Sequence, residues 1–178
     1  MNSTLILQTP RLILRPIAHK DAAQLFAIRK DPEVMRYIPR PLAVTIEDAQ
    51  AMIDRMMKGI EDKISLNWTI TLGDADEFIG YIGYFRMNLE NHRAEIGYIT
   101  HPDYQGKGYT KEALKATTDY GFNEMGLHTI EAVTDPENMA SQQLLLKSGF
   151  VKEAHFRENV FFNNRYLDSV HYTLFKPD

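Results

Sequence analysis

The chain has 178 residues, and at roughly 150 residues per domain this length predicts a single domain over residues 1–178. It contains no cysteine, which excludes disulfides, thiolate zinc sites, iron–sulfur clusters and a cysteine nucleophile. The net charge of -4 gives no broad electrostatic reason to bind nucleic acid, and no apolar run is long enough to span a membrane. We therefore expect a cytoplasmic protein that acts as a monomer or homodimer, without a nucleic-acid or membrane partner.

The first half of the chain shows alternating strand and helix patterns. In chain order they predict a strand at 5–16, helices at 19–30 and 45–61, and strands at 66–72, 77–88 and 93–100. Thr45 and Asp48 form a capping signal at the start of the second helix. The segment Gly73-Asp74-Ala75-Asp76 has the chemistry of a hairpin turn between two of the strands.

The second half adds helices and closes with a hairpin. The patterns predict a helix at 109–122, a strand at 128–133, a helix at 139–148, and two strands within 150–175. Gly149 ends the last helix, and Asn163-Asn164 marks the hairpin turn. The order β α α β β β α β α β β is that of an α/β (α+β) domain, with about seven strands, about four helices and one βαβ-like passage.

A glycine-rich turn precedes the third helix. Gly106 and Gly108 allow the backbone to approach a ligand closely, and the N-terminus of the helix leaves several amide N–H groups unpaired. With the helix dipole, these amides suit a phosphate or pyrophosphate. The Walker pattern is absent, and Lys111 stands where a dinucleotide pattern needs its third glycine. Alone, such a glycine pair is more often an ordinary tight turn.

The surrounding motifs make the interpretation of this turn more specific. Residues 105–110, Gln105-Gly106-Lys107-Gly108-Tyr109-Thr110, resemble the Gln/Arg-x-x-Gly-x-Gly/Ala signature of the GNAT acetyltransferases. Four further motifs resemble the RimJ/RimL-type branch, which contains ribosomal-protein N-terminal acetyltransferases: Thr9-Pro10-Arg11-Leu12-Ile13-Leu14-Arg15, Ala94-Glu95-Ile96-Gly97-Tyr98, Asn138-Met139-Ala140-Ser141 and Lys147-Ser148-Gly149-Phe150. The resemblance covers nearly the whole chain and implies the GNAT fold, with a mixed, mostly antiparallel central sheet.

The resemblance also implies the cosubstrate and its contacts. Acetyl-CoA would donate an acetyl group to a primary amine, foremost the N-terminal α-amine of a protein or peptide, by direct attack in a ternary complex. The expected contacts are to the pyrophosphate from Gln105, Gly106, Lys107, Gly108, Tyr109 and Thr110, to the pantetheine from Tyr98, Ile99 and Thr100, and beside it from Asn138. Two positions depart from the family pattern. Thr110 replaces the usual Gly or Ala, and Leu145 replaces a tyrosine that serves many members as general acid.

The attacking amine needs a base. Glu95 is the leading candidate because it lies on the strand before the turn, although simple pairing with a nearby cation is equally open. Glu131 on the next strand and His128 before it are weaker candidates, more typical of solvated or structural side chains.

The departing thiolate needs a proton or a hydrogen bond. Ser141 is the leading candidate because the RimJ/RimL branch places serine here, and local helix capping is the alternative. Tyr98, Tyr104 and Tyr109 are further possible donors, although packing is the more typical role of all three. No metal is expected, because the six histidines show no paired ligand spacing.

The acceptor stays open at this level. An α-amine with a pKa of about 8 suits one weak base better than a lysine amine at about 10.4. The alternatives are a small amine (a polyamine, amino acid or aminoglycoside) and an acyl-CoA-binding sensor without turnover, which Leu145 favours weakly. The methionines Met52, Met56, Met57 and Met87 could line an acceptor groove or, more typically, fill the core. The Asn163-Asn164 hairpin could cover the acceptor side or form a dimer edge.

Overall fold

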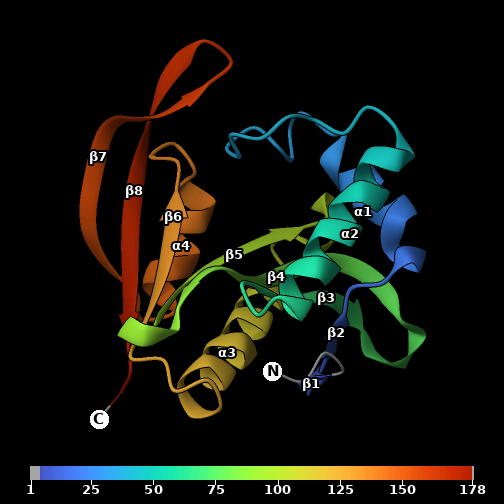
Figure 1. Cartoon of the computed structure of the whole chain (residues 1–178), viewed down its shortest axis with the longest axis horizontal. Helices are drawn as coiled ribbons and strands as arrows, with labels where there is room; N and C mark the ends of the chain where they lie inside the picture. The colour runs from blue at the N-terminus through green and yellow to red at the C-terminus, as the bar shows by residue number, and fades with distance from the viewer. Residues whose placement is uncertain (1–4, 178) are drawn as a thin grey trace.

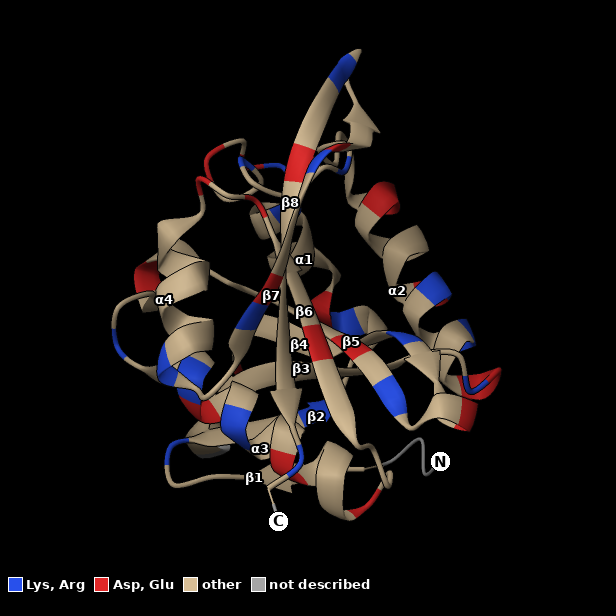
Figure 2. Cartoon of the chain, turned by 90° about the vertical axis from the view of Figure 1, so that its left-hand side faces the viewer, with Lys and Arg blue, Asp and Glu red and all other residues tan. Residues whose placement is uncertain are grey.

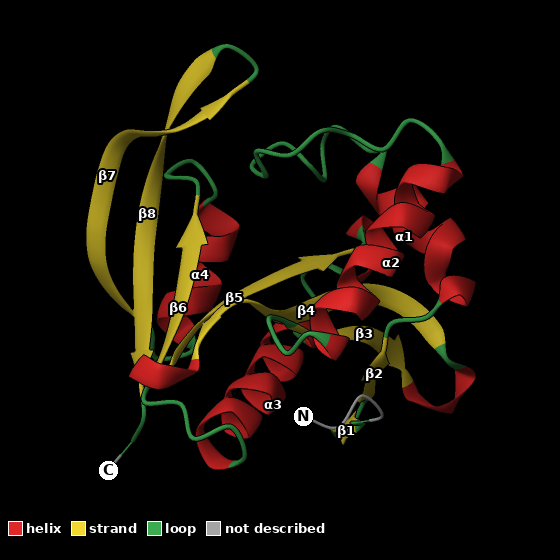
Figure 3. Cartoon of the chain, viewed as in Figure 1, coloured by secondary structure: helices red, strands yellow, loops and turns green. Residues whose placement is uncertain are grey.

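The structure is a computed structural model and describes residues 5–177. Its strands form one eight-stranded sheet in the order β1-β2-β3-β4-β5-β6-β8-β7, with helices on both faces (Figures 1 and 3). The strands are β1 Leu7–Gln8, β2 Leu12–Pro16, β3 Leu66–Leu72, β4 Glu77–Asn88, β5 Arg93–Thr100, β6 Thr129–Thr134, β7 Val151–Phe162 and β8 Arg165–Phe175. The helices are α1 Ala22–Arg29, α2 Ile46–Glu61, α3 Tyr109–Asn123 and α4 Met139–Lys147.

The predicted elements are present, with one correction at the N-terminus. The single strand predicted at 5–16 is two strands, β1 and β2, which pair antiparallel with Leu7 opposite Leu14. The chain reverses at Thr9, whose hydroxyl accepts a hydrogen bond from the N–H of Leu12 at 2.9 Å. Pro10 follows with no N–H to offer a strand partner. The sheet therefore has eight strands, and the order begins β β α α.

The two faces of the sheet carry separate apolar clusters. On one face α3 and α4 contribute Leu114 and Leu145, which pack with Ile96 of β5. On the other face α1 and α2 contribute Leu25 and Ile53, which share a cluster with Ile99 of β5. Because side chains alternate along a strand, successive residues of β5 are presented to different helices.

The sheet is split between β5 and β6. The two strands run parallel and pair only from Arg93 to Glu95 with Thr129 to Glu131. Beyond Glu95 they diverge, as Figures 1 and 3 show, so the edge of β5 that faces β6 has no strand partner as far as Thr100. All other strand pairs in the sheet are antiparallel.

The last two strands form an arm that extends beyond the sheet. β8 pairs with β6 only from Val170 onward, so residues 156–169 of β7 and β8 have only each other as strand partners. This C-terminal arm projects from the body of the molecule (Figures 1 and 2). Asn163 and Asn164 turn it with φ of 48° and 56°, the left-handed values that a tight hairpin turn requires, and the predicted hairpin is confirmed. Within residues 5–177, no helix combines the length and apolarity needed to cross a membrane.

Candidate active site

The glycine turn (residues 105–110) joins β5 to the N-terminus of α3. Gly106 and Gly108 have φ of 72° and 80°, which side-chain-bearing residues rarely adopt, and Gly108 is the N-cap of α3. Within residues 5–177 the amide N–H groups of residues 106–111 have no hydrogen-bond acceptor. A run of free amides at a helix N-terminus fits a pyrophosphate, so the turn has the geometry that the resemblance implies.

Several side chains hold this turn in place. Gln105 donates from Nε2 to the carbonyl oxygen of Thr100 at 3.0 Å. The hydroxyls of Thr100 and Thr110 lie 2.8 Å apart, so the threonine at the unusual position ties the turn to the end of β5. Arg11 donates from Nη1 to the carbonyl oxygen of Lys107 at 3.0 Å, and its guanidinium lies 4.6 Å from the ring centre of Tyr109.

Arg11 is itself fixed by Glu112 in the first turn of α3. Its Nε donates to that carboxylate at 2.6 Å, and Thr9 donates to the same group at 2.6 Å. Burial opposes ionisation of Glu112, but the hydrogen bonds from Thr9 and Arg11 outweigh it and lower the pKa of this carboxyl. The sequence singles out Arg11 only as part of a motif, because no local pattern links it to a turn that begins 94 residues later.

The free edge of β5 leads from the glycine turn back to the point where β5 and β6 separate. Tyr98, Ile99 and Thr100 lie on this edge, where the backbone is open to an extended ligand. Their side chains point elsewhere. Tyr98 packs against the α3–α4 cluster, Ile99 is buried in the α1–α2 cluster, and Thr100 bonds to Thr110. The main chain of these three residues is therefore what the free edge exposes, while their side chains are engaged elsewhere.

Tyr98 and Ser141 come together on the α3–α4 face. The tyrosine hydroxyl lies 2.9 Å from the Oγ of Ser141 in the first turn of α4. Burial raises the pKa of Tyr98 to about 12, with the Ser141 hydroxyl acting in the opposite direction. The capping role weighed for Ser141 belongs to Asn138, whose side-chain oxygen accepts from the Ser141 N–H at 3.1 Å. Leu145 is only 1% exposed and belongs to the core.

Glu95 lies on the opposite face of β5, with its carboxylate in an ion pair. Arg86 of β4 contacts it at 3.0 Å, and the Glu95 side chain is 24% exposed. Glu131 is the register partner of Glu95 on β6 and pairs with Arg93 at 2.8 Å. The two glutamates therefore have similar surroundings at the point where the strands begin to diverge.

Two other candidates from the sequence lie elsewhere. His128 precedes β6 at the closed end of the β5–β6 pair, away from the diverging ends. The hydroxyl of Tyr104 donates to Glu77.

Of the methionines, Met56 is buried, Met52 and Met57 pack in the α1–α2 cluster, and Met87 packs in the α3–α4 cluster, so their core role is confirmed. Within residues 5–177, no three His, Cys, Asp or Glu side chains are grouped as metal ligands would be.

A groove of about 560 Å³ opens beside the separated strands, on the face that carries Glu95. Its walls come from the loop at 32–44 between α1 and α2, the end of β6 at 133–135, and residues 160–169 of the C-terminal arm. In Figure 1 that loop and the arm face each other at the top of the molecule. Because of the role proposed for it below, we call this hollow the acceptor groove.

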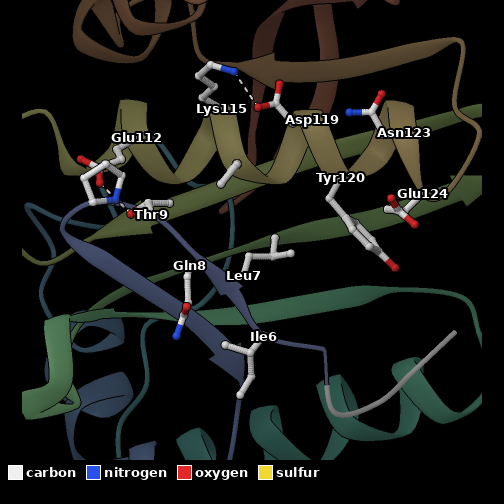
Figure 4. Close-up of a pocket in the computed structure, with 12 residues that line it drawn as sticks. Ile6, Leu7, Gln8, Thr9, Glu112, Lys115, Asp119, Tyr120, Asn123 and Glu124 are labelled. Atoms are coloured by element: carbon white, nitrogen blue, oxygen red, sulfur yellow. Dashed lines mark hydrogen bonds and ion pairs between the residues drawn. The ribbon is translucent and has the colours of Figure 1, made fainter.

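A second hollow of about 520 Å³ lies between β1 and α3 (Figure 4). Its lining includes Leu7, Tyr120 and the ion-paired Lys115 and Asp119. It contains none of the site residues predicted from the sequence.

The family of the chain follows from comparison with known proteins. Residues 11–151 match the acetyltransferase (GNAT) domain family. The chain belongs to this family. It is an N-acetyltransferase with the GNAT fold, and acetyl-CoA is the typical cosubstrate of such enzymes.

Three relatives illustrate how far this similarity extends. YoaA, an uncharacterized N-acetyltransferase of Bacillus subtilis, is 38% identical over 172 residues, which cover 97% of each chain. A GNAT-family acetyltransferase of Bacillus anthracis superposes with a TM-score of 0.86 at 30% identity, covering 96% of this chain and 98% of that one. Spermidine N(1)-acetyltransferase of Escherichia coli is 27% identical over 164 residues, covering 92% of this chain and 85% of the relative.

Proposed function

We propose that this acetyltransferase transfers the acetyl group of acetyl-CoA to the α-amine at the N-terminus of a protein or peptide, as the RimJ/RimL branch does. A cytoplasmic location belongs to the same proposal. The observation that carries it is the surroundings of Glu95, the carboxylate of β5 at the point where β5 and β6 begin to diverge. Glu95 already accepts a hydrogen bond from Arg86 at 3.0 Å, so part of its capacity to accept a hydrogen bond from an amine is taken.

A carboxylate that is already hydrogen-bonded to an arginine favours an acceptor amine that is partly neutral without its help. An α-amine has a pKa of about 8, so roughly a quarter of it is unprotonated at pH 7.5. A lysine-type amine with a pKa of about 10.4 is unprotonated at roughly the 0.1% level at the same pH. With Glu95 as the base, directly or through a water molecule, the α-amine is the better substrate.

The cosubstrate would lie along the glycine turn and β5. The free amides of residues 106–111 would bind the pyrophosphate, with Lys107 and Lys111 adding positive charge. The main chain of residues 98–100 would pair with the pantetheine arm, and Asn138 lies beside Ser141 at the start of α4. When bound, acetyl-CoA supplies an activated acetyl thioester.

The chain places its proton acceptor and proton donor on opposite faces of β5. Glu95 and Tyr98 are three positions apart, so alternation along the strand separates their side chains. Glu95 would take a proton from an amine that enters through the acceptor groove. On the α3–α4 face Ser141 would donate a hydrogen bond or a proton to the sulfur and recover the proton from Tyr98.

A polyamine is the second candidate acceptor. It is supported by the 27% identity to a spermidine N(1)-acetyltransferase, which covers 92% of this chain. The two candidates differ in the amine that reacts, so one panel of acceptors separates them.

The test is the release of free thiol from acetyl-CoA, measured with a colorimetric thiol reagent. The protein has no cysteine to add background. Peptides with free N-termini should release thiol, and the same peptides with acetylated N-termini should not. Thiol release with spermidine and none with free peptides would overturn the proposed acceptor. No release with any amine, despite acetyl-CoA binding, would favour a sensor.

A further inference from the structure

The acceptor groove lies within reach of the proposed base. Val133 of β6 forms part of its wall and is two residues beyond Glu131, the register partner of Glu95. Two strand residues span about 7 Å. Glu131 and Val133 point to the same face as Glu95, because Ala132 and Ile130 between and before them pack in the α3–α4 cluster. A molecule in the groove can therefore present its amine to Glu95.

The walls of the groove are mainly apolar. They include Tyr37 and Leu42 of the loop, Val133 of β6, and Val160, Phe162 and Leu167 of the C-terminal arm. Leu42 and Val133 are 42% and 36% exposed, so part of this apolar surface is open to solvent. The groove therefore suits an acceptor with an apolar side chain close to its amine.

The carboxylates of the groove are already engaged. Asp135 accepts a hydrogen bond from the N–H of Glu137 at 2.7 Å. Asp168 accepts from the N–H of Glu158 at 2.9 Å and contacts His155 at 2.7 Å. The N–H of Glu158 and the His155 side chain together lower the pKa of Asp168. A polycation in the groove would find no cluster of free carboxylates.

The cations of the groove, in contrast, have little to pair with. Arg36 is 60% exposed, and its nearest acidic contact is Glu33 at 4.0 Å, where both side chains are largely in solvent. An ion pair of this kind contributes little. Arg40 donates to the carbonyl oxygen of Pro39 at 3.4 Å and, among residues 5–177, has no carboxylate partner. Both arginines lie on the loop side of the groove and complement an anion there.

We propose that the acceptor groove binds a peptide N-terminus with an apolar side chain next to the α-amine and carboxylates a few residues further along, which Arg36 and Arg40 recognise. This inference rests on the proposed function and names the kind of peptide that it uses. A peptide entering between the loop and the arm places its amine toward Glu95. Its following residues then pass the loop that carries the two arginines.

Two peptides test this inference. Both begin Ala-Leu, and they differ only in carrying Glu-Glu or Arg-Arg at positions three and four, so neither has a lysine amine. At low salt the acidic peptide should have a kcat/KM about tenfold higher, because two solvent-exposed ion pairs are worth a few-fold each. The difference should shrink at high salt.

A charge reversal provides the control for specific recognition. The double variant Arg36→Glu/Arg40→Glu should prefer the Arg-Arg peptide. Lys147→Glu/Lys152→Glu changes the net charge by the same amount at exposed residues outside the groove, and it should keep the wild-type preference. Both variants should retain the wild-type affinity for acetyl-CoA.

The outcomes separate this inference from the proposed function. Equal kcat/KM for the two peptides, or a wild-type preference for Arg-Arg, would overturn the inference and leave α-amine acetylation standing. An unchanged preference in the Arg36→Glu/Arg40→Glu variant would also overturn it. Acetylation of spermidine with neither peptide acetylated would overturn the proposed function as well.

Discussion

The glycine turn and the acceptor groove are built in different ways. In the turn, residues 105–110 follow one another in the chain and would bind the ligand through main-chain amides. The groove instead combines side chains from three segments, at 32–44, 133–135 and 160–169. A main-chain site needs only the backbone conformation, which a few glycines set. A side-chain site changes its chemistry with every substitution on its walls.

This difference explains why the donor side of the enzyme is easier to assign than the acceptor side. The same turn can serve any acetyltransferase of the family, whatever the acceptor. In the proposed function the groove selects the acceptor, and in this chain its walls are mainly apolar with two exposed arginines.

The largest effect is expected from stiffening the turn. Gly106→Val should weaken acetyl-CoA binding by about 100-fold, because valine resists a φ of 72° and the displaced amides lose two hydrogen bonds to phosphate at about 1.5 kcal/mol each. Gly126→Val is the matched control. Gly126 has a φ of 68°, and at both glycines a side chain would have open space. Calorimetric titration measures the affinity.

The control separates binding from strain. Both variants should lower the thermal unfolding temperature by similar amounts, since both force valine into a left-handed conformation. If Gly106→Val bound acetyl-CoA as tightly as Gly126→Val, the amides of the turn would not hold the pyrophosphate.

The next effect concerns the α3–α4 face. Ser141→Ala should lower kcat by about 100-fold as the donor to the sulfur is lost. Tyr98→Phe should lower it by about tenfold, because it removes one hydrogen bond at 2.9 Å. If the proton passes from Tyr98 through Ser141, the double variant should be no slower than Ser141→Ala alone.

If kcat of the double variant instead fell by the product of the two single decreases, the two residues would act independently, which would contradict the proton path from Tyr98 through Ser141. Tyr104→Phe is the matched control among the tyrosines, because its hydroxyl donates to Glu77 instead. Its kcat should stay within about twofold of the wild type, as for other surface substitutions.

A smaller effect distinguishes the two glutamates. Glu95→Gln should lower kcat/KM by about tenfold, less than the roughly 100-fold or more typical of a general base, because an α-amine is already partly neutral. Glu131→Gln removes an equivalent ion pair, at 2.8 Å instead of 3.0 Å, and should leave the rate nearly unchanged. Initial rates with one peptide measure both. A larger decrease in kcat/KM for Glu131→Gln than for Glu95→Gln would identify Glu131 of β6 as the base.

The smallest expected effect concerns the pH dependence of kcat/KM in the wild-type enzyme. With a peptide acceptor, kcat/KM should rise up to a pH of about 8, as the α-amine loses its proton, and then level off. The value of kcat/KM should not fall again below pH 10. Tyr98 has a pKa of about 12, so its hydroxyl loses its proton only as the pH rises through that value. Rates followed by mass spectrometry from pH 6 to about 10 test this shape. A rise that continues above pH 9 would indicate a lysine-type amine.

Most of the fold could be predicted from the sequence because its elements carry local signals. Thr45 and Asp48 mark the start of α2, where the Asp48 carboxylate accepts from the Thr45 N–H at 3.0 Å. The split of the first strand was missed because the alternation of residues 5–16 hides the turn at Thr9 and Pro10. That residues 1–178 form one domain stays a prediction.

The site was only partly predictable, for a physical reason. The glycine turn is a local motif, and Ser141 follows a recognisable cap at Asn138. The partners of the key groups are not local. Arg86 reaches Glu95 across a strand pair, and Tyr98 meets Ser141 from an element 43 residues away. Only the folded sheet brings these pairs together, so from the sequence packing is the favoured explanation for Tyr98.

One measurement tests the central claim most directly. A peptide with a free N-terminus, an apolar second residue and a single internal lysine is incubated with acetyl-CoA and the wild-type enzyme, and fragmentation mass spectrometry locates the added acetyl group. The account predicts acetylation at the N-terminal α-amine, with the lysine side chain left free. Acetyl groups on the lysine amine, with the α-amine unmodified, would contradict it.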